Sequence, residues 1–477
     1  MKRITLSVLI LTCCLGTLFA QNTPLPSHHK WEGFLEEAML PLNLVIDTYN
    51  LDNHDTVIPC LYSPIQTNNG LFPSEWSYSN DTLCYYNKNI QARLSLTYNP
   101  TDSSFSGIFR QGTMRTYIKF TPCDTFTTFK RPQEPQPPYR FISREVVLQR
   151  KDKEGHNVVL TGTLTLPLSV NTQEKIKYPA VLLVSGSGQQ NRDEEICNHK
   201  PFLVIADYFA QQGIAVLRYD DRGTGHSVGE VATATTLDFA DDAEALFNYL
   251  RKQPNIDSKR VGILGHSEGG MIAPMIASRN HKVAFVIMMA GPGCSGGDIL
   301  LQQNKALFKT QRVTDSLIDR RIQCMKDFFG AMDTLVPSNY FLPFTHIIAT
   351  HTEGLTPEQI DTIGLHKKDA YNWAQQMQMP WMRTFIKLDP ANYLPRVKCP
   401  ILALNGSRDL QVLATPNLEA IQRLASHSAK LQIKQIPNLN HLFQHCNTGL
   451  TKEYIYIEET LAPEALQTMT DWILQQD

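Results

Sequence analysis

The frame Gly-His-Ser-x-Gly occurs twice in this chain, at residues 225–229 and at residues 265–269. A serine in such a frame becomes a nucleophile only at a sharp turn between a strand and a helix, where its hydroxyl faces a base and backbone N–H groups. Glycines are needed there because side chains would collide in this crowded turn. The pattern alone is weak evidence in a chain with 26 glycines among 477 residues, so the segments around each frame decide which serine is a candidate.

The second frame has the neighbours that this turn requires. A short apolar run at residues 260–265 is typical of a buried parallel strand. After the serine, Ile272, Met275 and Ile276 recur at helical spacing. We therefore predict Ser267 as the nucleophile.

The first frame lacks these neighbours. The strand predicted before it ends near Tyr219, several residues upstream of the serine. Residues 230–236 are rich in β-branched side chains and have no helical pattern, and a helix resumes only near Leu237. The sequence therefore places Ser227 in a loop.

The N-terminus has the features of a secretory signal peptide at residues 1–20. Two basic residues precede an apolar run of about sixteen residues, which is too short for a durable membrane span. Cleavage is expected after Ala20. A lipidated Cys13 or Cys14 is the alternative, although the residues before them fit a lipoprotein cleavage site poorly. We expect an exported protein, periplasmic or secreted, with no integral membrane span.

Composition limits the classes of partner and cofactor. The formal net charge is −2 and basic runs are lacking, which argues against nucleic acid as a partner. No Cys-x-x-Cys pattern occurs, so metal and redox sites are not indicated. In an oxidising compartment both disulfides and buried free thiols remain open. The cysteines that follow the signal are Cys60, Cys84, Cys123, Cys197, Cys294, Cys324, Cys399 and Cys446.

The patterning changes twice along the chain. Residues 21–129 contain runs that alternate apolar and polar residues between turn residues, which predicts a small, mostly antiparallel β-domain. Residues 130–138 contain four prolines and are expected to form a stiff, extended linker. From residue 139 to residue 477 strands alternate with helices, as in a mostly parallel α/β sheet.

The predicted α/β domain contains eight strands, with a long helical insertion between the sixth and the seventh. This insertion, at about residues 293–397, is expected to form a lid over the carboxyl ends of the strands, with helical stretches at 298–308, 313–329 and 359–385. The strands are predicted near residues 144–150, 156–166, 179–185, 214–219, 260–265, 284–290, 399–405 and 431–436. The helices of the sheet are predicted near residues 200–212, 236–252, 268–279, 414–426 and 462–475.

Two residues at later strand ends complete a candidate set for serine chemistry. Asp409 follows the apolar run at residues 400–404, and His441 follows the strand at residues 431–436. The order nucleophile, acid, histidine is the one used with this type of turn, and the acid orients the imidazole that acts as base. Alone, Asp409 is equally well explained as a turn residue and His441 as a surface histidine. Their joint placement with Ser267 favours the catalytic interpretation.

Other interpretations of the polar residues are weaker. His441 and His445 have the spacing of a metal pair on a helix, but no third ligand is evident. The adjacent acids at residues 220–221 and 241–242 cannot face each other across a substrate, as the acids of a glycosidase do. We therefore predict no metal and no cofactor.

An oxyanion hole needs two backbone N–H groups aimed at the developing charge. One is predicted at Glu268, directly after the nucleophile. The other is predicted at Ser187, in the loop after the third strand, with Gly188 and Gln189 as alternatives. This loop lacks the third glycine and the lysine of a phosphate-binding loop.

Six stretches of the chain match one family in register, at residues 160–164, 186–188 with 192–193, 220–227, 265–270, 404–409 and 440–441. Together they resemble the bacterial α/β-hydrolase esterases of the EstD type, which are related to the serine aminopeptidase-like hydrolases. The resemblance implies an α/β-hydrolase fold and carboxylesterase activity with Ser267, Asp409 and His441 as triad. In that family the serine that corresponds to Ser227 is structural. The chain departs from wider α/β-hydrolases at Ser185, where a histidine is common.

Three functions remain open at this point. The first is an exported serine esterase that cleaves a small-molecule ester through an acyl-enzyme intermediate. The second is an aminopeptidase, a thioesterase or an acyltransferase on the same triad, since the fold does not choose among these. Asp315, Asp319 and Glu358 in the lid are loose candidates for holding a substrate amine. The third is a binding protein whose β-domain captures a sugar or a lipid, although an intact triad argues against it. The sequence does not indicate an oligomeric state.

Overall fold

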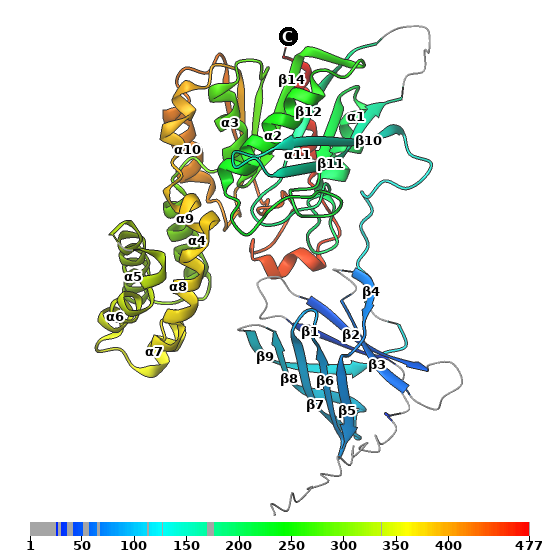
Figure 1. Cartoon of the computed structure of the whole chain (residues 1–477), viewed down its shortest axis with the longest axis vertical. Coiled ribbons are helices and arrows are strands. Elements are labelled where there is room, and N and C mark those ends of the chain that lie inside the picture. Colours follow the sequence, from blue (N-terminus) through cyan, green and yellow to red (C-terminus); the bar gives the residue numbers. More distant parts are fainter. Residues whose placement is uncertain are drawn as a thin grey trace, which may run out of the picture. The chain divides into compact units, whose positions relative to one another are not determined.

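The computed structural model describes residues 25–26, 30–35, 42–50, 57–63, 67–111, 114–125, 127–168, 176–334 and 336–476. The chain divides into two compact units, Met1–Thr128 and Phe129–Asp477, which are drawn in Figure 1. The predicted signal peptide, with Cys13 and Cys14, lies outside the described residues. The eight later cysteines are all free thiols in this structure.

The N-terminal unit is an antiparallel β-sheet, as predicted. In its described part nine strands follow the order β4-β3-β2-β1-β9-β8-β7-β6-β5. Residues of β7 and β9 alternate between buried and exposed, because successive side chains of a strand point to opposite faces. The buried face packs around Trp31, Phe105 and Phe120. The strands are β1 Lys30–Leu35, β2 Leu42–Asn50, β3 Val57–Ser63, β4 Thr67–Leu71, β5 Glu75–Ser79, β6 Thr82–Asn87, β7 Ala92–Asn99, β8 Ser104–Gln111 and β9 Met114–Pro122.

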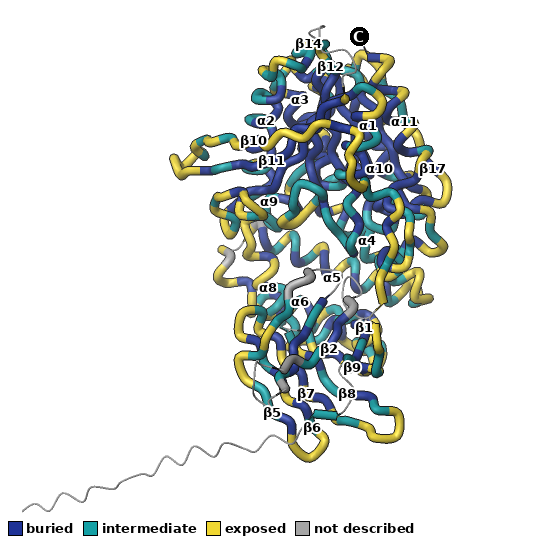
Figure 2. The backbone as a smooth tube through the Cα atoms, turned by 90° about the vertical axis from the view of Figure 1, so that its right-hand side faces the viewer, coloured by how far each residue is buried: buried dark blue, intermediate teal, exposed yellow. Residues whose placement is uncertain are grey.

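The second unit has the predicted α/β-hydrolase fold. Its eight-stranded sheet has the order β10-β11-β13-β12-β14-β15-β16-β17. β11 is antiparallel to both of its neighbours, and the strands from β13 to β17 are parallel. The central strands are buried on both faces (Figure 2), which explains their continuous apolar runs. The strands are β10 Phe141–Lys151, β11 Asn157–Pro167, β12 Tyr178–Val184, β13 Ala215–Tyr219, β14 Ile256–His266, β15 Val286–Met289, β16 Ile401–Gly406 and β17 Leu431–Ile436.

Helices cover both faces of this sheet. On one face α1 and α11 pack around Phe209 and Trp472. On the other face α2, α3 and α10 pack around Phe247 and Ile276. These helices are α1 Pro201–Gln211, α2 Thr236–Leu250, α3 Gly269–Arg279, α10 Ala414–Leu424 and α11 Pro463–Leu474. The described residues of this unit also form the 3-10 helices η1 Pro337–Asn339, η2 Lys367–Asp369, η3 Pro390–Asn392, η4 Leu394–Arg396 and η5 Thr451–Tyr456.

The lid between β15 and β16 contains six helices in its described part and a core of its own around Phe328 and Phe344. The single helical stretch expected at residues 359–385 is three helices, because Gly364 ends one with a left-handed φ of 60° and Pro380 begins another. α6 was not predicted; its Pro343 lies in the first turn, where proline is tolerated. The lid helices are α4 Gly296–Thr310, α5 Asp315–Thr334, α6 Phe341–Thr352, α7 Pro357–Ile363, α8 Ala370–Gln378 and α9 Pro380–Lys387.

The proline-rich segment at residues 130–138, expected to be a stiff, extended linker, packs against the rest of the α/β unit. Arg131 is buried, and besides the carbonyl oxygen of Lys130 its guanidinium donates to three carbonyl oxygens farther along the α/β unit. Gln133 donates to the carbonyl oxygen of Leu461 (2.7 Å) and accepts from the N–H of the same residue (2.9 Å). This docking segment, residues 129–138, is therefore part of the α/β unit. The acceptors of Arg131 are the carbonyls of Cys197 (2.9 Å), Ile455 (3.0 Å) and Ile457 (3.1 Å).

Candidate active site

Ser267 lies at the turn between β14, which ends at His266, and α3, which begins at Gly269. Its φ of 52° is left-handed, a conformation that costs a non-glycine residue about 1–3 kcal/mol and is found mainly at functional sites. Its N–H donates to the carbonyl oxygen of Met289 at the end of β15 (3.0 Å). Ser267 is partly exposed whereas His266 and Glu268 are buried. The structure thus places the predicted nucleophile, partly exposed, on a strained turn.

Close backbone contacts explain two glycines of this frame. A Cβ atom on Gly265 would lie 1.9 Å from the carbonyl oxygen of Gly269. A Cβ atom on Gly269 would lie 2.1 Å from the carbonyl oxygen of Val184, the last residue of β12. Neither position can accept a side chain without moving the backbone. The turn, β12 and the start of α3 therefore form one tightly packed group.

Asp409 and His441 come together from the loops after β16 and β17. The Nδ1 atom of His441 lies 2.8 Å from Oδ2 of Asp409, and both side chains are buried. A carboxylate oxygen accepts here from the Nδ1–H group, so Nε2 is the ring nitrogen that faces away from Asp409. The other oxygen of Asp409 accepts from the N–H groups of Gln411 (2.8 Å) and Val412 (2.9 Å). Asp409 is therefore held in place and fixes the orientation of the imidazole.

His266 connects the Ser267 turn to His441. Its Nε2 lies 2.9 Å from the carbonyl oxygen of His441, its Nδ1 lies 2.9 Å from a carboxylate oxygen of Glu194, and the two imidazole rings are 4.8 Å apart. A protonated ring, which has two N–H donors, matches these two oxygen partners. Burial opposes this charge, yet the Glu194 carboxylate raises the pKa of His266 above its ordinary value. Within the described residues the Ser267 hydroxyl itself makes no hydrogen bond.

The loop after β12 approaches Ser267 at Gly186, where an added Cβ atom would lie 3.1 Å from Cβ of the serine. The N–H of Gly186 donates to Glu194 (2.6 Å), so it is not available to an oxyanion. In the part of the chain that the structure describes, the N–H groups of Ser187 and Glu268 have no acceptor. These two groups are the predicted oxyanion donors, and an oxyanion hole needs donors that are free in the resting site.

The Glu268 carboxylate links the Ser267 turn to the lid. It is buried and accepts from the Thr236 hydroxyl at the start of α2 (2.6 Å) and from the indole N–H of Trp381 in α9 (2.9 Å and 3.1 Å). The Ser187 hydroxyl is a further donor. Burial raises the pKa of Glu268, and the three donors counteract part of this rise. The lid, α2 and the loop after β12 therefore meet at one side chain.

Residues 199–445, just over half of the chain, match the family described as "Serine aminopeptidase, S33". The chain belongs to this family. The S33 hydrolase is 25% identical to Esterase EstD of Thermotoga maritima over 283 residues, which cover 59% of this chain and 58% of that protein. The resemblance inferred from the sequence motifs is thereby confirmed.

Shorter and more distant matches accompany these. Polyketide transferase claH of Penicillium crustosum is 30% identical over 143 residues, 28% of this chain and 45% of that protein. The solved structure of the Pyrococcus furiosus esterase Pf2001 covers 73% of this chain and 98% of its own, with 15% identity and a TM-score of 0.41. The S33 hydrolase thus spans a little over half the length of EstD, and less of the transferase.

In the S33 hydrolase, Ser227 is buried and bonded to backbone on both sides. Its hydroxyl donates to the carbonyl oxygen of Asp220 (2.7 Å) and accepts from the N–H of Thr161 (2.8 Å). The Asp220 carboxylate is in turn paired with Arg192 (2.8 Å). Ser227 therefore attaches the loop after β13 to β11.

Asp221 is a buried acid behind the loop after β12. It accepts from the Ser185 hydroxyl (3.2 Å) and from the N–H of Gln190 (3.0 Å). Burial raises the pKa of Asp221 to about 8, and the carboxylates of Glu268 and Glu194 add to the rise. Ser185, at the position where wider α/β-hydrolases commonly have a histidine, thus helps to hold the loop through Asp221.

Three residues of the site were missed by sequence reasoning: His266, Glu194 and Trp381. His266 belongs to the frame itself but also occurs in the first copy, and Trp381 is 113 positions away from the carboxylate that it contacts, so neither had a distinguishing local signal. The sequence already argues against a metal pair formed by His441 and His445. His445 instead faces Glu459 (2.9 Å) and Glu464 (3.0 Å).

Proposed function

We propose that this chain is an exported serine carboxylesterase that cleaves small-molecule esters through an acyl-enzyme intermediate. The observation that carries the proposal is the 2.8 Å hydrogen bond between Asp409 and His441, in an S33 hydrolase whose Ser267 lies on a left-handed turn between strand and helix. The name of the Thermotoga maritima relative, Esterase EstD, supports an ester substrate.

In the proposed reaction Oγ of Ser267 attacks the ester carbonyl carbon while Nε2 of His441 takes the serine proton. Asp409 keeps the Nδ1 proton in place and stabilises the imidazolium. The N–H groups of Glu268 and Ser187 donate to the oxyanion. His441 then gives its proton to the leaving alcohol, and a water that it deprotonates hydrolyses the acyl-enzyme. The chemistry needs no cofactor.

An aminopeptidase on the same residues is the second candidate, favoured by the description of the family. It would need an acid to hold the substrate amine. Asp315 and Asp319 on α5 and Glu358 on α7 are exposed residues of the lid, and the buried Glu268 is engaged with three neutral donors. These positions favour the ester over the peptide.

Comparison of substrates tests the proposal. The values of kcat/KM for a p-nitrophenyl ester, an aminoacyl p-nitroanilide and an acyl thioester are measured with one protein preparation, and the ester is expected to have the highest value. Faster turnover of the aminoacyl amide or of the thioester would contradict it. A fluorophosphonate probe should label Ser267, as located by peptide mapping. Failure to label folded protein would instead favour the catalytically silent binding protein.

Export is a separate part of the proposal and rests on the pattern of residues 1–20. Among the described helices, none is both long and apolar enough to cross a bilayer. N-terminal sequencing of protein from the periplasm or the medium should give a chain that begins at Gln21. A chain that begins at Cys13 or Cys14 would show a lipoprotein instead.

A further inference from the structure

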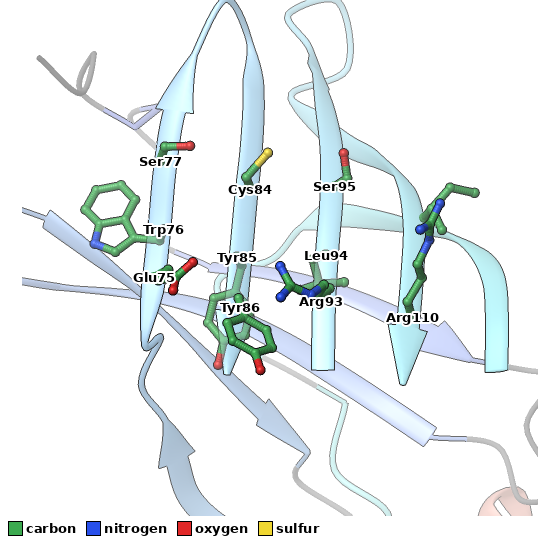
Figure 3. Close-up of a pocket in the computed structure, with 11 residues that line it drawn as sticks. Glu75, Trp76, Ser77, Cys84, Tyr85, Tyr86, Arg93, Leu94, Ser95 and Arg110 are labelled. Atoms are coloured by element: carbon green, nitrogen blue, oxygen red, sulfur yellow. The ribbon is translucent and has the colours of Figure 1, made fainter. Parts of the chain in front are cut away.

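The exposed face of the N-terminal sheet has an open hollow of about 580 Å³, lined by residues of strands β5 to β8. Neighbouring strands lie about 4.8 Å apart, so residues paired in register form a row across the sheet. Figure 3 shows four members of one such row, Glu75, Tyr86, Arg93 and Arg110. Register extends the row to Arg115 on β9.

Residues two positions along each strand share the same face, so further rows lie beside the first. Most members of these rows are hydroxyl side chains, and together they form a polar surface. The second row is Ser77, Cys84, Ser95, Ile108 and Tyr117, and the third is Ser79, Thr82, Thr97, Ser106 and Lys119.

The first row has an excess of positive charge. It contains three arginines and only one carboxylate, that of Glu75. Within the described residues no carboxylate pairs with any of these arginines, whereas Lys119 of the third row is paired with Asp102 (2.8 Å). Like charges opposite each other on neighbouring strands destabilise a sheet. Arg93, Arg110 and Arg115 occupy three successive strands, so an anion bound among them would relieve their repulsion.

Arg93, in the middle of the row, is preorganised to bind such an anion. The guanidinium of Arg93 lies over the ring of Tyr86, 3.8 Å from its centre. This cation–π contact fixes the guanidinium through its face and leaves the N–H groups at its edge free. Such an edge matches the two oxygens of a carboxylate.

We propose that this hollow binds an anionic polysaccharide of the polyuronate class. The carboxylates of the ligand contact the arginine row, and its hydroxyl groups contact the serine and threonine side chains of the neighbouring rows. Tyr117, which is 63% exposed, offers a flat surface on which a sugar ring can pack. The concave, hydroxyl-rich face fits a polyhydroxylated chain better than a flat bilayer. Binding here involves the N-terminal unit alone and does not depend on the proposed esterase activity.

Titration calorimetry on the mature chain carrying Ser267→Ala tests the proposal without turnover. Polygalacturonate should bind, whereas dextran, which is neutral, should not. Polyglutamate carries the same charge without sugar rings and should bind more weakly. The double variant Arg93→Gln/Arg110→Gln should lower the affinity for polygalacturonate about tenfold or more, because each lost contact is a charge-assisted hydrogen bond.

A matched control separates this site from general electrostatics. Lys252→Gln/Lys259→Gln removes two exposed charges from the α/β unit and should leave the affinity unchanged. Thermal melting checks that each variant is folded. Three results would overturn the proposal: no binding of polygalacturonate, unchanged affinity in the arginine variant, or equal affinity for polyglutamate or for anionic phospholipid vesicles.

Discussion

In the frame at residues 225–229 the serine hydroxyl is buried and bonded to backbone atoms on both sides, whereas in the frame at residues 265–269 it is partly exposed on a left-handed turn. The last glycines differ in the same way. A Cβ atom on Gly229 would meet Cβ of Arg222 at 3.1 Å, while one on Gly269 would meet a carbonyl oxygen at 2.1 Å. Both sequences encode a tight turn. Ser267 directly follows strand β14 and is partly exposed, whereas Ser227 lies several residues after β13 and is buried.

The largest expected difference between the frames is catalytic. If the proposed function holds, Ser267→Ala should lower kcat for a p-nitrophenyl ester about a millionfold, as loss of the nucleophile does in subtilisin. Ser227→Ala should keep kcat near the wild-type value but lower the stability by about 1–3 kcal/mol, because the N–H of Thr161 loses its acceptor. Steady-state kinetics and denaturant unfolding measure the two effects. Similar losses of kcat in both variants would remove the distinction between the frames.

The glycines should differ in stability. Gly269→Ala forces a methyl group against the carbonyl oxygen of Val184 and should destabilise the α/β unit by about 3 kcal/mol. Gly229→Ala, the matched change in the other frame, meets only a side-chain carbon at ordinary backbone angles and should cost less than about 1 kcal/mol. The midpoints of urea unfolding give both values. Equal midpoints would show that the second turn is less tightly packed than the distances indicate.

The residue after each serine provides a subtler contrast. Val228 is 60% exposed, whereas Glu268 is buried and bonded to Trp381 of the lid. Trp381→Phe keeps the ring and removes this hydrogen bond, so kcat/KM for an ester should fall about tenfold. Trp373→Phe, a matched indole change elsewhere in the lid, should have little effect. If both variants behave alike, the contact between lid and turn has no role in the reaction.

The smallest expected effect concerns Asp221, which lies between the first frame and the loop after β12. Its pKa of about 8 lies above its ordinary 3.8, so the stability that the protonated form contributes is complete below pH 3.8 and is lost as the pH rises through about 8. Asp221→Asn removes this titration. Melting temperatures are measured at pH 5, 7 and 9. The melting temperature of the variant should increase relative to that of the wild type as the pH rises. A constant difference between variant and wild type would contradict the raised pKa.

The parts of the fold that follow from local pattern were predictable. Apolar runs and helical spacing place β14, the turn and α3 because each depends on neighbours within a few residues. The position of His441 after the last strand follows from the same patterns. The division of residues 359–385 into three helices depends on Gly364 and Pro380, which a periodicity search overlooks.

The contacts that surround the candidate triad could not be predicted. His266 reaches Glu194 and the backbone of His441 across 72 and 175 residues, and no local pattern encodes such pairs. The arginine row of the N-terminal unit is of the same kind. Arg93 and Arg110 become neighbours only through strand register, which depends on turns and on the buried face rather than on the arginines themselves.

The docking segment determines where the two units can be separated in a chimaeric protein. Its composition suggests that a junction can be cut at residue 139, where the α/β strands begin. A cut there would remove Arg131 and Gln133 and leave buried carbonyl groups of the α/β unit without donors. A chimaera with a foreign N-terminal domain should therefore be joined before Phe129, so that the proline-rich residues remain attached to the α/β unit.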